Sequence, residues 1–314
     1  MDTPLVTVRC LTYNHEPHIR QCLEGLVMQQ TKFKFEAIVH DDASIDGTAT
    51  IIAEFAEKYP EIIKPIYETE NQYSKKDGSL RRIMDLNTRG KYVAFCDGDD
   101  CWIDSMKLQK QVDFLESNLD YGLVHTEIDH WYEQNDQTIN KFNKSTNNII
   151  PTGWVFDDLM NPQKYFIKLS TVLLRKELYD KRIGYLELKA NNVLSIDLVV
   201  WLELSRYAKF GYLSDSTMLY RVLGKSMSNF NSVDKSYQFL DSVLEIREYF
   251  ADRCNVSSEV RSKISIAKCL NSFNRSLYKN ERALAVSNFQ QLRANNVKIG
   301  NKKLLRYYIL KLFK

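Results

Sequence analysis

The sequence predicts an α/β fold with a mostly parallel sheet. Over the first hundred or so residues, short apolar segments rich in β-branched residues alternate with helical patterns. Strands that alternate with helices imply right-handed crossovers, which place helices on both faces of such a sheet. From Asp234 to Lys314 the pattern is helical throughout, so we also expect an appended bundle of three or four helices.

Length and composition restrict the class of protein. The 314 residues are 44% hydrophobic and 26% charged, with a net charge of only +3, which argues against disorder and against a generally nucleic-acid-binding surface. The N-terminus lacks a basic segment followed by an apolar core, and no stretch approaches the length of a membrane span, so we expect neither a cleaved signal nor a transmembrane helix. The six cysteines lack metal-site spacing and are expected to be reduced in a cytosolic protein.

The strands and helices of the first half follow from periodicity and from their polar boundaries. Asp46 or Thr48 is expected to cap the second helix. The expected strands are Leu5 to Leu11, Phe35 to His40, Ile62 to Tyr67 and Tyr92 to Cys96, and the expected helices run from His18 to Gln30, from about Thr48 to Tyr59 and from Leu80 to Asn87.

Three carboxylates follow the last of these strands. Asp97, Asp99 and Asp100 come directly after an apolar run that cannot bury charge without a partner. Carboxylates at this position suggest a divalent cation that is shared with the phosphates of a substrate. The alternative is a polar turn in which Gly98 supplies the bend.

Two further polar loops follow strands, at Thr12 to Glu16 and at Asp41 to Ser44. In parallel sheets ligands bind outside the carboxyl ends of the strands, so all three loops should line one crevice, although the second loop is equally consistent with a helix-capping turn. Neither a dinucleotide-binding glycine pattern nor a P-loop is present. A nucleotide would be held instead by a carboxylate at its base and, at its diphosphate, by a metal and by Arg81 or Arg82, unless these arginines only form a solvated helix face.

The segments VTVRCLTYNHE, IVHDDASIDGT and RGKYVAFCDGDDCWIDSMKLQKQVDFLE resemble the N-terminal half of a family 2 glycosyltransferase of the bacterial surface-polysaccharide type. The resemblance covers about residues 4 to 117 and implies the GT-A fold. It further implies a catalytic domain over residues 1–225, with a nucleotide-sugar-binding half at 1–117 and an acceptor-side half at 118–225. A helical region over residues 226–314 would follow.

The resemblance also implies roles for particular residues. The loop at Thr12 to Asn14 and the acid at Asp41 would hold the uridine of a UDP-sugar. Asp97 to Asp99 would be the D-x-D motif that binds Mn2+ or Mg2+. Asp99 would be the main ligand, and Asp97 would lie nearer the ribose or outside the direct ligands of the metal. The full expected donor site is Thr12, Tyr13, Asn14, Glu16, Asp41, Asp42, Arg82, Asp97 and Gly98, with Asp99 and Asp97 as metal ligands.

The second half of the chain contains a polar stretch and two segments that resemble strands of the same family. The polar stretch from Glu133 to Asn148 is expected to be a loop, as an acceptor-side insertion or a mobile lid. Tyr165 to Arg175 resembles the family's strand behind the donor sugar, and Phe210 to Val222 its strand and turn. Related sequences often continue with a metal-binding histidine, where this chain has Leu223, and Arg221 or Lys225 would help to neutralise the diphosphate.

Asp197 precedes a run with helical spacing and is expected at a helix N-terminus. From the residues alone, an acid stabilised by the helix dipole explains this position. Similar enzymes carry their catalytic base at this point of the sequence, so the resemblance implies that Asp197 is the base. Glu203 is the second choice.

The segment from Asn301 to Lys314 is an amphipathic helical pattern with a basic side. Leu304, Leu305, Tyr308, Ile309 and Leu312 are expected on one side of this helix. The segment would lie in an anionic membrane interface or dock on the core of the protein.

The resemblance as a whole implies an inverting glycosyltransferase. We expect a UDP-sugar donor, a glycan or polyprenyl-diphosphate-linked acceptor, and a place in the cytoplasm or on the inner face of the cell membrane, with no nucleic-acid partner. The alternatives are a sugar-phosphate nucleotidyltransferase and a non-catalytic carbohydrate- or lipid-binding protein. The first of these normally needs a glycine-rich loop, and Leu11 to His18 contains no glycine.

Overall fold

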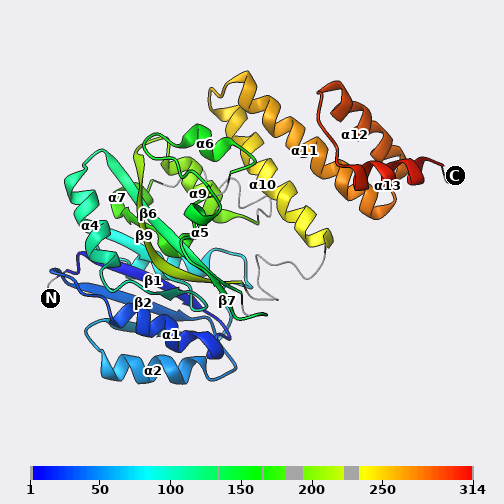
Figure 1. Ribbon diagram of the computed structural model, residues 1–314. Helices are drawn as coiled ribbons and strands as arrows, with labels where there is room; N and C mark the ends of the chain where they lie inside the picture. The colour runs from blue at the N-terminus through cyan, green and yellow to red at the C-terminus, as the bar shows by residue number, and fades with distance from the viewer. Residues whose placement is uncertain (1–2, 133, 165, 182–193, 223–232, 313–314) are drawn as a thin grey trace. The chain divides into compact units, whose positions relative to one another are not determined.

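The computed structural model describes residues 3–132, 134–164, 166–181, 194–222 and 233–312, which form two compact units (Figure 1). The first unit takes in residues 3–155, 166–181 and 204–222 of the described chain. The second takes in residues 156–164, 194–203 and 233–312. Two short segments from the middle of the sequence therefore group with the C-terminal helices, whereas the sequence predicts a single boundary at residue 225.

Strands and helices alternate through the first part of unit 1, as the sequence predicts. The four strands pair in the order β3-β2-β1-β4, and every pairing among them is parallel. The α/β fold class is confirmed. The elements are β1 (Val6–Thr12), α1 (Glu16–Val27), β2 (Phe35–Asp41), α2 (Thr48–Lys58), β3 (Ile63–Tyr67), α3 (Ser79–Asn87) and β4 (Tyr92–Phe95).

The other half of the sheet is mixed. β8 pairs antiparallel with both β4 and β6, β6 pairs parallel with β9, and β5 pairs antiparallel with β9. The sheet is therefore parallel from β3 to β4, which includes the strands that precede the three polar loops, and it is mixed beyond β4. The elements of this half are β5 (Cys101–Trp102), α4 (Lys107–Ser117), β6 (Tyr121–Tyr132), β7 (Gln137–Ile139), α5 (Phe142–Ser145), β8 (Leu173–Arg175), α7 (Lys176–Tyr179) and β9 (Lys209–Val222).

The expected loop at residues 133–148 is interrupted by two short elements within its described residues. β7 pairs with the end of β6 as a hairpin, and α5 follows. Buried Glu127 accepts hydrogen bonds from the backbone N–H of Asn143 at 3.1 Å and of Lys144 at 3.0 Å, and Phe142 stacks on His130 with ring centroids 3.6 Å apart. These contacts fix the chain to the sheet, so a polar composition does not make this segment a lid.

The expected strand over residues 165–175 is correct only at its end. β8 begins at Leu173, and Leu169–Thr171 form a 3-10 turn. The carbonyl of Ser170 accepts a hydrogen bond from the Trp102 indole at 2.8 Å, and the carbonyl of Thr171 accepts one from the Gln111 amide at 2.8 Å. Side chains thus bind the carbonyls that a longer strand would use for pairing.

The core of unit 1 lies between the sheet and its helices. Cys10 of β1 and Cys96 after β4 flank Cys22 of α1, with sulfur distances of 3.8 and 3.7 Å, and all three are fully buried. All six cysteines are free, as the sequence predicts. Helices α1 and α2 lie side by side on one face of the sheet (Figure 1).

Unit 2 is helical in its described residues. The fully buried Arg247 donates a hydrogen bond to the carbonyl of Leu159 at 2.9 Å and so ties α10 to α6. No helix in the described part of the chain is both long and apolar enough to cross a membrane. The helices are α6 (Phe156–Met160), α9 (Ile196–Leu204, whose last residue groups with unit 1), α10 (Val233–Arg253), α11 (Ser258–Lys279), α12 (Arg282–Ala294) and α13 (Asn301–Leu312).

The terminal helix α13 docks through one side. Tyr307 is only 3% exposed and stacks on Phe289 of α12 with ring centroids 4.1 Å apart. Leu304 packs against the same cluster, whereas Leu305 and Tyr308 are exposed. The expectation that Leu304 and Leu305 lie on one side is therefore wrong, because Tyr307 and Leu304 together define the docked face.

Candidate functional site

The three polar loops meet at the carboxyl ends of β1, β2 and β4. The backbone N–H of Asp42 donates to the carbonyl of Thr12 at 3.0 Å, and the N–H of Gly98 donates to the carbonyl of Leu11 at 2.8 Å. The loop after β1 is thus bound on one side to the loop after β2 and on the other to the loop after β4. This is the convergence expected at the ligand-binding edge of a parallel sheet.

Gly98 lies at the point of closest contact between two of these loops. A Cβ atom added at Gly98 would lie 2.7 Å from Thr12 Oγ1 and 2.7 Å from His15 Nδ1. In the described part of the chain, neither of these two buried atoms has a hydrogen-bond partner. Buried polar atoms are almost always paired, so two such atoms beside the same glycine indicate a place for a polar ligand or water.

Side chains of the first two loops tie the loops together. The Oδ1 atom of Asn14, whose φ is 54°, accepts from the backbone N–H of Ile45 at 2.9 Å, and its own N–H donates to Ser44 Oγ at 2.9 Å. Glu16 accepts from the N–H of Gly47 at 2.9 Å, while Asp46 accepts from the N–H of Glu16 at 3.1 Å. Asn14 and Glu16 thus have structural partners at the site where the sequence predicts donor contacts.

Asp46 lies just before α2, whose N-cap residue is Gly47, so the expected cap by Asp46 or Thr48 is wrong in position. The Oδ1 atom of Asp46 still accepts from the backbone N–H of Thr48, the first residue of the helix, at 3.0 Å. The Thr48 hydroxyl donates to the same oxygen and accepts from the N–H of His15 at 2.9 Å. The N-termini of α1 and α2 are therefore held by one set of hydrogen bonds.

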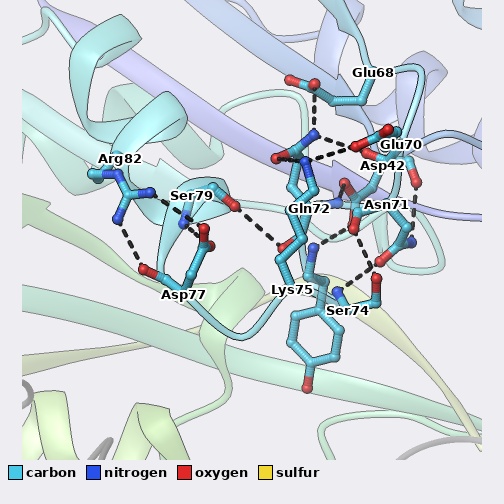
Figure 2. A network of polar contacts seen from close by, with 11 residues as sticks. Asp42, Glu68, Glu70, Asn71, Gln72, Ser74, Lys75, Asp77, Ser79 and Arg82 are labelled. Atoms are coloured by element: carbon cyan, nitrogen blue, oxygen red, sulfur yellow. Dashed lines mark hydrogen bonds and ion pairs between the residues drawn. The ribbon is translucent and has the colours of Figure 1, made fainter.

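The two acids after β2 have different surroundings. The carboxylate of buried Asp42 accepts from the backbone N–H of Gln72 at 2.7 Å and of Tyr73 at 3.0 Å, and Figure 2 shows the network that this forms after β3. Buried Asp41 instead accepts from the Ser44 hydroxyl. Burial, with the charge of Asp41 second, raises the pKa of the neighbouring Tyr67. Asp42 therefore shapes the loop after β3, and the assignment of Asp41 to the nucleoside stays a prediction.

Asp97 to Asp100 form a tight acidic turn. The backbone N–H of Asp100 donates to the carbonyl of Asp97 at 2.9 Å. The Ser170 hydroxyl donates to the Asp100 carboxylate and accepts from the N–H of Asp97 at 3.3 Å. Arg221 of β9 donates to the carbonyl of Asp99 at 2.6 Å and also to the Gln21 side chain. The turn is thus held by polar contacts from the 3-10 turn before β8 and from Arg221 of β9, and Arg221 is itself bound by Gln21 of α1.

The acids of this turn affect one another's charge. Burial raises the pKa of Asp100 to about 8, and the charge of Asp99 adds to the shift. Among the described residues, no three His, Cys, Asp or Glu side chains are grouped so as to hold a metal ion. Carboxylate oxygens are ligands that Mg2+ and Mn2+ accept, so the turn could contribute part of a metal site, and a metal ion at Asp97 and Asp99 stays a prediction.

A buried lysine supports the turn from behind. The Lys107 side chain is 0% exposed, and its Nζ donates to Gln111 Oε1 at 2.6 Å and to the carbonyl of Thr171 at 3.4 Å. The same Nζ lies 4.3 Å from the centroid of the Trp102 ring, whose indole N–H binds Ser170. Burial lowers the pKa of Lys107 to about 7. Lys107 thus positions the segment that carries Ser170.

The remaining predicted donor residues lie at the edge of this region. Tyr13 is exposed. Arg82 is also exposed and is engaged by Asp77, through its carbonyl at 2.8 Å and its carboxylate at 3.7 Å (Figure 2). Leu223 and Lys225 lie outside the described residues. The role of Arg82 at a diphosphate stays a prediction.

Asp197 belongs to unit 2. It lies in the first turn of α9 and is half-buried, which confirms its expected place at a helix N-terminus. Glu203 of the same helix is buried. The assignment of Asp197 as the catalytic base stays a prediction.

The sequence did not single out His15, Ser170 or Lys107 as functional. His15 and Ser170 stand within segments that were noticed, but only the fold brings them to Gly98 and to Asp100. Lys107 stands in a helical pattern where lysine is ordinarily a solvent-exposed residue. Lys107 stands four residues before Gln111, and residues at i and i+4 share a helix face. This spacing could have indicated that the two side chains form a polar pair.

Comparison with known proteins gives a consistent family. The family described as Glycosyl transferase family 2 matches residues 8–163. An uncharacterised protein of Mycobacterium tuberculosis is 39% identical over 111 residues, which are 35% of this chain and 31% of that protein. This chain therefore aligns with only about a third of the length of the mycobacterial relatives.

Two further relatives carry functional names. A putative teichuronic acid biosynthesis glycosyltransferase of Bacillus subtilis is 28% identical over 72% of this chain and 82% of its own length. An Escherichia coli protein named UDP-Glc:alpha-D-GlcNAc-diphosphoundecaprenol beta-1,3-glucosyltransferase is 30% identical over 41% of this chain and 48% of its own.

Solved structures share the fold. A mannosyltransferase from Pyrobaculum calidifontis, in complex with GDP-Man and Mn2+, matches 100% of this chain and 82% of its own with a TM-score of 0.60 and 18% identity. Residues 1–349 of TarS from S. aureus, in complex with UDP-GlcNAc, match 94% of this chain and 93% of their own with a TM-score of 0.53 and 17% identity. At these identities the likeness shows the GT-A fold alone.

The packing at Gly98 predicts the effect of one methyl group. Gly98→Ala should lower the free energy of unfolding by about 1–3 kcal/mol, because Thr12 and His15 must move to admit the new Cβ. Gly300→Ala is the control, since nothing lies within 4 Å of a Cβ at that position. Urea denaturation of both variants and the parent measures the difference. Equal stabilities for all three proteins would show that the loops do not make this close contact.

The burial of Lys107 predicts a pH-dependent contribution to stability. The lysine pKa is about 7 in the folded protein and about 10.4 in the unfolded chain. Between these values the unfolded chain binds more protons, so the parent gains stability as the pH rises, by about 1 kcal/mol per unit. Lys107→Met lacks this group, and the parent should gain relative to the variant between about pH 7.5 and pH 9.5. Parallel stability curves would contradict the burial of an ionisable lysine.

Proposed function

The chain belongs to glycosyl transferase family 2, and on this premise we propose that it is an inverting glycosyltransferase of polysaccharide biosynthesis. The donor is a nucleotide-sugar, with UDP as the nucleotide. The observation that carries the proposal is the meeting of three loops at Gly98, with Asp41 on one side and the acidic turn on the other. This arrangement offers a carboxylate that can bind the nucleobase and an acidic turn that can bind a cation together with the diphosphate.

The loops after β1 and β2 take the nucleoside in this proposal. Asp41 accepts a hydrogen bond from the base, and Thr12, Tyr13 and Asn14 line the same edge. The unpaired Thr12 Oγ1 and His15 Nδ1 atoms support this placement, because a polar ligand would satisfy them. Asp42 and Glu16 contribute by holding the loops in shape, through the backbone N–H groups that they bind.

The acidic turn takes the diphosphate. Asp99 and Asp97 would hold Mg2+ or Mn2+, and a bound ion would supply charge neutralisation for the departing nucleotide. Burial is the main cause of the raised pKa of Asp100, and the charge of Asp99 adds to it, so Asp99 and Asp100 lie close enough to interact electrostatically. Ser170, Arg221 and Lys107 fix the turn, so the carboxylates need little reorganisation to bind.

The proposed identity of the donor is supported by the names of similar proteins, and no contact among the described residues distinguishes one nucleotide from another. TarS is solved with UDP-GlcNAc, and the E. coli relative is named for UDP-Glc, whereas the archaeal mannosyltransferase is solved with GDP-Man. We therefore propose a UDP-sugar and include GDP-mannose as the comparison donor. The acceptor is proposed to be a glycan or a polyprenyl-diphosphate-linked glycan, a class that the name of the E. coli relative contains.

Sugar transfer in this proposal is a single displacement with inversion at the anomeric carbon. Asp197 takes the proton from the acceptor hydroxyl as its oxygen bonds to the anomeric carbon, and the bond from that carbon to the diphosphate oxygen breaks with its electron pair. The acceptor oxygen must approach in line with the breaking bond, so positioning supplies much of the remaining rate.

The role of Asp197 is tested by a matched pair of variants. Asp197→Asn should lower turnover by about 10²–10⁴-fold and leave donor binding unchanged, because only the proton acceptor is lost. Glu203→Gln, a carboxylate-to-amide change in the same helix, should keep the parent rate. Release of UDP from UDP-GlcNAc and UDP-Glc, and of GDP from GDP-mannose, with lipid-linked acceptors measures turnover. If Asp197→Asn turned over at the rate of the parent protein, Asp197 would not be the catalytic base. If only Glu203→Gln lost turnover, Glu203 would be the catalytic base instead.

A further inference from the structure

The last 33 residues carry only positive charge. Residues 282–314 contain eight Lys or Arg residues and no Asp or Glu. Because the whole chain has a net charge of +3, the preceding 281 residues carry a net charge of −5. The basic balance of this protein is therefore confined to its C-terminal end, which is the segregation expected for binding to an anionic partner.

Described basic side chains of this segment differ from those of the neighbouring helix α11 in whether they form ion pairs. In α11, Lys263 binds Glu259 at 2.6 Å, Lys268 binds Glu248 at 2.5 Å and Lys279 binds Asp234 at 2.9 Å. By contrast, six exposed side chains of the terminal segment form no ion pair with any described carboxylate. We call these the terminal basic group: Arg282, Arg293, Lys298, Lys302, Lys303 and Arg306.

Helix α13 also presents apolar side chains to solvent. Its docked face is defined by Tyr307, which stacks on Phe289. Leu305 is 63% exposed and Tyr308 is 49% exposed. The edge of Tyr308 also contacts Phe289, with ring centroids 6.4 Å apart, so Leu305 and Tyr308 together form an apolar edge beside the docked face of α13. Helices α11, α12 and α13 contact one another at the C-terminal end (Figure 1).

The exposed apolar and basic side chains alternate over one surface. Lys302 lies three residues before Leu305 and four before Arg306, and Tyr308 lies three residues after Leu305, so Leu305 lies between Lys302 and Tyr308, and the four residues spread over about half of the helix circumference. We call this side the outer face of α13. Arg306 also donates to the carbonyl of Tyr278 at 3.4 Å, which extends the face to the end of α11.

We propose that the outer face of α13, with the terminal basic group around it, binds the interface of an anionic lipid bilayer. Lys and Arg side chains attract lipid phosphates, while Leu305 and Tyr308 enter the boundary between headgroups and acyl chains. Tyr is suited to this boundary because its ring is apolar and its hydroxyl is polar. A nucleic acid or an acidic protein would be held by the charges alone and would leave the exposed leucine unused. The proposal does not depend on transferase activity.

Vesicle binding by the full chain tests the proposal. Cosedimentation is measured with vesicles of phosphatidylcholine alone and of phosphatidylcholine mixed with phosphatidylglycerol. The parent should bind only the mixed vesicles, and added salt should weaken binding because it screens the charges. A variant carrying Lys298→Glu, Lys302→Glu and Lys303→Glu should bind about tenfold less or weaker still.

Two further variants isolate the contributions. Lys32→Glu, Lys58→Glu and Lys144→Glu change the net charge by the same amount at exposed positions elsewhere, and this variant should bind like the parent. Leu305→Ser with Tyr308→Ser keeps every charge and should also weaken binding severalfold. The proposal would be overturned if the variant at Lys298, Lys302 and Lys303 or the variant at Leu305 and Tyr308 bound vesicles as well as the parent protein. It would also be overturned if the matched charge control lost as much binding as the variant at Lys298, Lys302 and Lys303. Release of UDP, measured without vesicles, shows separately whether the transferase function holds.

Discussion

The site depends on the close contact between Gly98 and the loop that follows β1. Any side chain at this position would displace Thr12 and His15, so the acidic turn and the first loop can approach only at a glycine. That approach places the turn after β4 beside the loop that is itself bound to the loop after β2. In the proposed function, the contact would bring together the edge that binds the nucleoside and the turn that binds the diphosphate, which are the two requirements for holding a nucleotide-sugar.

The surroundings of the turn explain how carboxylates can be held close together. Ser170 binds the turn through its hydroxyl, and Arg221 binds it through its guanidinium, which contacts the carbonyl of Asp99. The buried amine of Lys107 lies behind the segment, where it binds Gln111 and Thr171. Three aspartates are thus gathered in one fixed turn, and in the proposed function a divalent ion would bind there together with a diphosphate.

The sequence was sufficient for the parallel half of the fold and for the place of the crevice. Runs of β-branched residues ending in polar loops identify β1 to β4, because period and composition are local signals. The turn at Leu169–Thr171 and the hairpin at β7 could not be predicted, since Trp102, Gln111 and Glu127 stabilise them from distant positions in the sequence. For the same reason Asp42 resembled a ligand-binding acid, although its hydrogen-bond partners Gln72 and Tyr73 lie thirty residues further along the chain.

The central claim is that the loops at Gly98 and the acidic turn form one metal-assisted binding site for a nucleoside diphosphate. Isothermal titration with UDP, in the presence and absence of Mn2+, tests this claim most directly, and Asp99→Asn serves as the matched variant. The account predicts that the parent binds UDP, that Mn2+ strengthens binding, and that the variant loses the part of the affinity that depends on Mn2+. Absence of UDP binding by the parent in the presence of Mn2+ would contradict the account.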